Sequence, residues 1–62
     1  MHEEFLKTVN NSDYWLVDTD HIREVKYKKD GSNVCYTHEI EEFIKKNQNN
    51  PVLEIINQYR IL

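Results

Sequence analysis

The chain has 62 residues, with eleven acidic and eight basic side chains and a formal net charge of −3. This length allows one small domain with a limited core, which excludes a deep active-site cleft. No apolar run approaches the roughly 20 residues needed to cross a bilayer, which excludes a membrane-spanning protein. The mild negative charge is opposite in sign to that of a typical nucleic-acid binder.

The cysteine content and the first residues indicate the cellular compartment. Cys35 is the one cysteine of the chain and cannot form an internal disulfide, as is usual for proteins of a reducing compartment. Residues 1–5 lack the basic start and apolar core of a signal peptide. We therefore expect a cytoplasmic protein with a single domain, residues 1–62.

The first predicted element is a short helix over residues 2–9. Phe5, Leu6 and Val9 fall on one side at helical spacing, and two glutamates near the start favour the positive N-terminal end of a helix. The polar residues 10–13 then end this element.

Two strands are predicted next. Residues 14–17 form a short run of aromatic and branched side chains, which is typical of a strand, and residues 18–20 supply a turn. Apolar and polar residues then alternate from residue 22 to residue 28. This alternation places Arg23, Val25 and Tyr27 on one face, with the two apolar side chains directed to the core.

A β-hairpin is predicted around Asp30 and Gly31. Asp-Gly is a strong hairpin signal, because a tight turn needs a positive φ that glycine adopts without a Cβ clash. The partner strand is expected at residues 33–36.

Two helices are predicted after this strand. Thr37 is expected to cap a helix whose apolar face contains Ile40, Phe43 and Ile44. Residues 47–51 interrupt it, because proline lacks the N–H that a continuing helix requires. Asn50 as N-cap, with proline at the first helical position, then begins the last helix.

The predicted fold is α+β, a three-stranded antiparallel sheet of order α-β-β-β-α-α with its helices on one face. The expected core consists of Phe5, Leu16, Val25, Tyr27, Val34, Ile40, Phe43, Ile44, Val52, Ile55, Ile56 and Tyr59. In the last helix, Leu53 and Ile61 lie outside the apolar stripe, which leaves open a homodimer through this helix. Residues 59–62 as a short edge strand are the alternative.

Catalytic and metal chemistry have weak support in the sequence. Cys35 and His38 are three residues apart, but a structural zinc site needs four ligands and a second pair is missing. A nucleophilic cysteine needs an orienting group and an oxyanion site as well. We expect Cys35 to be a buried packing residue and the protein to be a non-enzyme without metal or cofactor.

The charged residues give two candidate binding surfaces. The first is acidic and suits a basic cleft on another protein: Asp18, Asp20, Glu39, Glu41 and Glu42. The second is basic, lies on the predicted hairpin and suits phosphates: Arg23, Lys26, Lys28 and Lys29. Turn formation, helix capping and a solvated strand face are the structural alternatives for both sets.

The order of the predicted elements resembles that of small phage-encoded anti-CRISPR proteins that inhibit type II-A Cas9. The likeness covers the N-terminal helix, residues 11–14 opening the first strand, Asp30-Gly31 between strands, residues 40–44 in a helix and a further helix. The resemblance implies a phage or mobile-element protein that binds and inhibits a host protein, such as a nucleic-acid-processing enzyme, by mimicking nucleic acid. A small nucleic-acid-binding regulator that uses the basic set is the alternative.

Overall fold

The computed structural model describes residues 2–29 and 31–60, apart from the side chains of residues 59 and 60. The predicted α+β class is confirmed, but the described residues form four strands instead of three. The elements in chain order are β1 (His2–Val9), β2 (Ser12–Asp18), β3 (Arg23–Lys28), β4 (Cys35–Glu39), α1 (Ile40–Lys46) and α2 (Leu53–Arg60).

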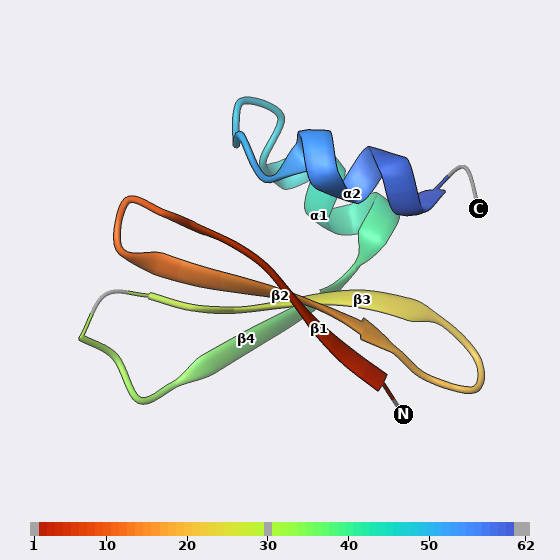
Figure 1. Ribbon diagram of the computed structural model, residues 1–62, viewed down its shortest axis with the longest axis horizontal. Coiled ribbons are helices and arrows are strands. Elements are labelled where there is room, and N and C mark those ends of the chain that lie inside the picture. Colours follow the sequence, from red (N-terminus) through yellow and green to blue (C-terminus); the bar gives the residue numbers. More distant parts are fainter. Residues whose placement is uncertain (1, 30, 61–62) are drawn as a thin grey trace.

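The sheet is an antiparallel meander. Its strand order, β1-β2-β3-β4, follows the chain, so each strand pairs with the next one along the sequence. Both helices lie on the same side of the sheet, and the other side carries no helix (Figure 1). The expectation that the helices cover one face is therefore correct.

The predicted first helix is wrong, because these residues form β1. Asn10 and Asn11 have φ values of 50° and 64°. Positive φ at both central residues is what a type I′ turn requires, and this two-residue turn joins β1 to β2. The β1–β2 register shifts between Phe5 and Lys7. This bulge lets Leu6 and Val9 both pack against the core, which imitates helical spacing in the sequence.

The predicted central strands are confirmed, with β2 and β3 paired from Asp13–Lys28 to Asp18–Arg23. Thr19 closes the turn between them: its Oγ1 accepts from the Ile22 N–H at 3.0 Å.

The predicted hairpin turn leads into β4, and Gly31 has the expected positive φ of 69°. Asp30 lies outside the described residues. Strand β4 begins at Cys35, two residues later than predicted, and ends at Glu39. Val34 precedes the strand and is 57% exposed, so its predicted place in the core is wrong.

Thr37 lies inside β4 and does not cap α1, contrary to the prediction. The helix begins at Ile40 after Glu39, whose side chain makes no capping hydrogen bond. Residues 35–39 pair with β3 instead. The hydrogen bonds between the two strands occupy backbone groups that would otherwise bond within a helix.

The break between the helices lies where it was predicted, but α2 begins at Leu53 and not at residue 51. The Oδ1 of Asn50 accepts from the Val52 N–H at 3.0 Å, which caps the turn that leads into α2. The Asn50 side chain also donates to the Tyr14 hydroxyl at 3.1 Å, which fastens the start of α2 to the sheet. Residues 59 and 60 continue α2, so the alternative edge strand is wrong there. Residues 61 and 62 lie outside the described residues.

The core lies between the helices and the middle of the sheet. Its buried members are Tyr14, Leu16, Val25, Ile40, Phe43, Val52 and Ile56, with Leu6, Val9, Tyr27, Ile44 and Leu53 packed against them. Phe5 was predicted in this core but is 55% exposed on the opposite face, because the bulge follows it. The predicted core residue Tyr59 has no described side chain.

Candidate functional site

The side of the sheet without helices carries a defined set of side chains, which we name the helix-free face. Directly paired residues of neighbouring strands share a face, so the register assigns its members. From strand to strand they form three rows: Glu3, Val17, Glu24 and Glu39; Phe5, Trp15, Lys26 and Thr37; and Thr8, Asp13, Lys28 and Cys35.

An aromatic pair occupies the middle of the helix-free face. The Phe5 ring stands edge-on to the Trp15 ring, with ring centroids 5.9 Å apart and an interplanar angle of 70°. The ammonium of Lys26 lies 5.1 Å from the Trp15 centroid, within cation–π range. Phe5 remains 55% exposed. Such ordered, solvent-accessible aromatic side chains are typical anchors of protein interfaces.

Val17 provides a second apolar contribution to this face. It is only 6% exposed, yet it does not belong to the core cluster under the helices. Its direct neighbours across the strands are Glu3 and Glu24. The helix-free face therefore has an apolar centre beside an acidic row.

The acidic row contains one paired and two unpaired carboxylates. Glu3 is bound by Lys26, with Nζ and Oε1 2.5 Å apart. Glu24 lies directly opposite Glu39 across the β3–β4 pair. Among the described side chains, neither of these two has an ion-pair partner. Like charges placed directly opposite each other on a sheet are destabilising, so folding does not favour this arrangement.

The acidic set predicted from the sequence is divided by the fold. Glu39 belongs to the acidic row, and Asp18 lies at the same end of the sheet, where its carboxylate is 3.6 Å from Arg23 Nε. Asp20 is exposed in the adjoining turn. Glu41 and Glu42 lie on α1, which covers the opposite side of the sheet.

The basic set is divided as well. Lys26 and Lys28 point to the helix-free face, whereas Arg23 points to the other face and contacts Asp18. The Lys29 ammonium lies 5.2 Å from the centroid of the Tyr36 ring. These four cations therefore do not form a single stripe.

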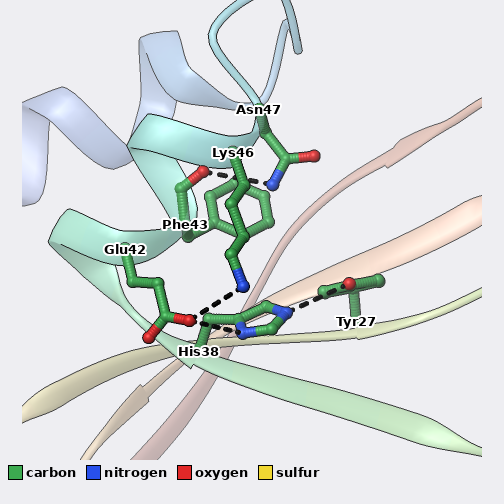
Figure 2. Close-up of polar contacts among 6 residues, drawn as sticks. All are labelled: Tyr27, His38, Glu42, Phe43, Lys46 and Asn47. Carbon is green, nitrogen blue, oxygen red and sulfur yellow. Dashed lines mark hydrogen bonds and ion pairs between the residues drawn. The ribbon is translucent and has the colours of Figure 1, made fainter.

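A chain of polar contacts joins α1 to the sheet on the helix-covered side (Figure 2). The Tyr27 hydroxyl and His38 Nε2 are 3.3 Å apart, and His38 Nδ1 lies 3.7 Å from Glu42 Oε1. Lys46 donates to the same carboxylate oxygen at 2.9 Å. This hydrogen bond, followed by the positive charge of Lys46, lowers the pKa of Glu42 below its ordinary 4.5.

The Glu42–His38–Tyr27 chain has the order of an acid, an imidazole and a hydroxyl. The Nδ1–Oε1 distance of 3.7 Å exceeds hydrogen-bond length, and Tyr27 is stacked between Tyr14 and Tyr36 with centroids 5.5 Å and 5.3 Å away. The hydroxyl is thus held by ring packing, and these contacts orient α1 on β3 and β4.

The Cys35–His38 pair considered from the sequence does not assemble. The two residues differ in parity along β4, so Cys35 is on the helix-free face and His38 on the covered face. Cys35 is exposed, and its predicted role as a buried packing residue is wrong. Within residues 2–29 and 31–60, no three histidine, cysteine or acidic side chains gather as metal ligands.

A polar cleft of about 440 Å³ lies between the β1–β2 turn and the loop joining the helices. Side-chain amides dominate its lining, from Asn10, Asn47, Gln48, Asn49 and Asn50. Asn47 donates to the Phe43 carbonyl and Asn50 caps the turn that leads into α2, so two of these amides have structural roles.

The sequence interpretation missed Glu3, Phe5, Trp15 and Glu24 as members of one surface. Strand alternation would have placed Trp15 on the other face of the sheet from Leu16. The assignment of residues 2–9 to a helix hid the partners of Trp15 on β1.

In the described part of the chain, neither helix has the length and apolarity needed to span a membrane. Comparisons with family models, curated proteins and solved structures found no match.

Proposed function

We propose that this chain is a small non-enzymatic protein that binds and inhibits a host protein, and that the helix-free face is its contact surface. The pair of the exposed Phe5 and the half-buried Trp15, beside the Glu24–Glu39 pair, is the observation that carries the proposal. Exposed aromatic side chains and opposed like charges do not stabilise the fold of the free chain. Both are suited to a surface that contacts a partner.

The chemistry of the face defines the partner that would fit it. An apolar pocket would receive Phe5 and Trp15, and lysine or arginine side chains beside that pocket would neutralise Glu24 and Glu39. Proteins that process nucleic acids carry such cationic surfaces. Asp18 and Asp20, at the same end of the sheet, would extend the acidic contact.

The biological setting is proposed from the resemblance of the sequence, of which the central strands and the two C-terminal helices remain and the N-terminal helix does not, since residues 2–9 form β1. We place the chain among phage or mobile-element proteins that act in the host cytoplasm against defence systems, of which anti-CRISPR inhibition is one form. The fold supports this setting by its size and surface: it is a small α+β domain with one helix-free, partly aromatic face (Figure 1).

A nucleic-acid-binding regulator is the second candidate, because Lys26 and Lys28 share the helix-free face with Phe5 and Trp15. Single-strand binders combine cations with aromatic stacking platforms in this way. The same face carries four carboxylates, from Glu3, Asp13, Glu24 and Glu39, which would repel phosphates.

Affinity capture from bacterial lysate, with and without nuclease, distinguishes the two candidates. A stoichiometric protein partner that survives nuclease is expected. The Glu24→Gln/Glu39→Gln variant should bind it more weakly than the wild type does, and this difference should grow as the salt concentration is lowered. The Glu41→Gln/Glu54→Gln variant removes two charges from the helices and should bind like the wild type. Equal binding by both variants would contradict the proposed surface.

The nucleic-acid candidate predicts a different result. Partners would disappear with nuclease, and binding of a single-stranded oligonucleotide would fall steeply with salt concentration and with Lys26→Gln/Lys28→Gln. A flat salt response would exclude it.

A further inference from the structure

Strand β4 leaves one edge of the sheet open. The strand order gives it a single neighbour, β3, so its outer backbone groups have no strand partner within the described residues. A row of unpaired N–H and C=O groups is a template for another strand.

The two edges of the sheet differ in their protection. Strand β1 has a bulge between Phe5 and Lys7 and an exposed lysine within it, and both devices oppose strand addition. Strand β4 pairs with β3 in a continuous register over its five residues and contains neither lysine nor proline. The available edge is therefore β4.

The sequence of β4 is complementary to itself in the antiparallel direction. With a two-fold axis at Thr37, each Thr37 faces the other, Tyr36 faces His38, and Cys35 faces Glu39. Paired side chains then point to the same face of the sheet, and no like charges face each other. Threonine pairs and aromatic pairs are favourable in such positions.

The side chains around the edge favour the same arrangement. Tyr36 is 40% exposed although it stacks on Tyr27, with centroids 5.3 Å apart, and Tyr27 stacks on Tyr14. In the symmetric pairing, His38 of the second copy continues this aromatic row and covers the exposed side of Tyr36.

We propose that the chain forms a homodimer in which β4 of one copy pairs antiparallel with β4 of a second copy, centred on Thr37. Because the axis is perpendicular to the sheet, both sets of helices lie on one side and the two helix-free faces become continuous. This inference does not depend on the proposed function. It moves self-association from the C-terminal helix to β4, since Leu53, which was predicted to lie outside the apolar stripe, packs against the core.

Disulfide trapping tests the register. In the Cys35→Ser/Thr37→Cys variant the new thiols belong to directly opposed residues, whose Cα atoms are about 4.5 to 5.5 Å apart in an antiparallel pair. Disulfides accept Cα separations of about 4.4 to 6.8 Å, so mild oxidation should give a covalent dimer. The control Cys35→Ser/Thr8→Cys places an exposed thiol on β1 and should remain monomeric. Absence of cross-linking at position 37, or equal cross-linking in both variants, would overturn the proposal.

Sedimentation equilibrium tests the association without a new bond. The pairing involves five residues per strand, so we expect a concentration-dependent dimer. In the Thr37→Glu variant the new carboxylate lies beside Lys26 in the monomer. In the dimer the two new carboxylates, one from each copy, face each other directly. This repulsion should weaken dimerisation by about two- to fourfold, and more at low salt than at high salt. The control Thr8→Lys gains Asp13 as its neighbour and should dimerise like the wild type. A wild-type chain that stays monomeric at millimolar concentration would contradict the inference.

Discussion

Removal of one carboxylate from the Glu24–Glu39 pair should stabilise the protein. The residues are directly opposed, and side chains in such pairs begin about 5 Å apart. Two unit charges at about 5 Å in water repel by about 0.8 kcal/mol at low ionic strength, and by about half of that at physiological salt. Glu24→Gln should therefore raise the free energy of unfolding by about 0.4 to 0.8 kcal/mol.

This gain corresponds to a rise in Tm of about 2 to 6 °C for a domain of this size, larger at low salt than at high salt. Thermal unfolding followed by circular dichroism measures it. Glu39 also precedes α1, where its charge favours the helix N-terminus, so Glu39→Gln alone mixes two effects. A double-mutant cycle of Glu24→Gln and Glu39→Gln isolates the repulsion.

The control is Glu54→Gln, in the first turn of α2, where loss of a carboxylate should leave Tm unchanged or lower it. An unchanged or lower Tm for Glu24→Gln would refute the repulsion. Strictly additive effects of the two substitutions in the cycle would refute it as well.

Substitutions at three further positions test the core, the turn and the polar contacts of α1. Ile56→Asp should unfold the domain, because Ile56 is fully buried and an unpaired buried carboxylate costs several kcal/mol; a native circular dichroism melt would contradict the core assignment. Gly31→Val should lower stability by about 1 to 2 kcal/mol through backbone strain at φ 69°, since a Cβ there meets no atom within 4 Å, whereas Gly31→Asn should lose less; equal denaturant midpoints would show that strain is absent. Because Lys46 lowers the pKa of Glu42 in the folded state, the stabilisation is present above pH 4.5 and is lost as the pH falls through the lower, folded value. The difference between wild type and Glu42→Gln in a pH series of unfolding midpoints should vanish in acid, and a constant difference would contradict this origin.

The elements with local signals were predictable from the sequence. The β3 alternation, the positive φ at Gly31 and the break at Asn50 and its following proline each depend on neighbouring residues alone. The helical stripe with Ile40 and Phe43 was correct for the same reason, since spacing within one turn decides which side chains are buried.

The elements that depend on distant pairing were not predictable in this way. Residues 2–9 have helical apolar spacing only because a bulge places Leu6 and Val9 on the same face of a strand. Thr37 has the composition of a helix cap, but its pairing opposite Lys26 places it in β4. In both segments tertiary contacts outweighed local preference.

The candidate site depends on the same distant pairing. Phe5 and Trp15 are ten positions apart and become neighbours through the β1–β2 register, and Glu24 meets Glu39 through the β3–β4 register. Charge patterning along the chain identified Glu39 but grouped it with Glu41 and Glu42, which the helix carries to the other side of the sheet.

One measurement decides whether the helix-free face binds a partner. It compares how much host protein the Phe5→Ala and Val34→Ala variants capture from nuclease-treated lysate. The two side chains are almost equally exposed, at 55% and 57%, but only Phe5 belongs to this face. We expect Phe5→Ala to lose the partner that the wild type captures and Val34→Ala to retain it. Equal recovery of that partner by both variants would contradict the proposed binding surface.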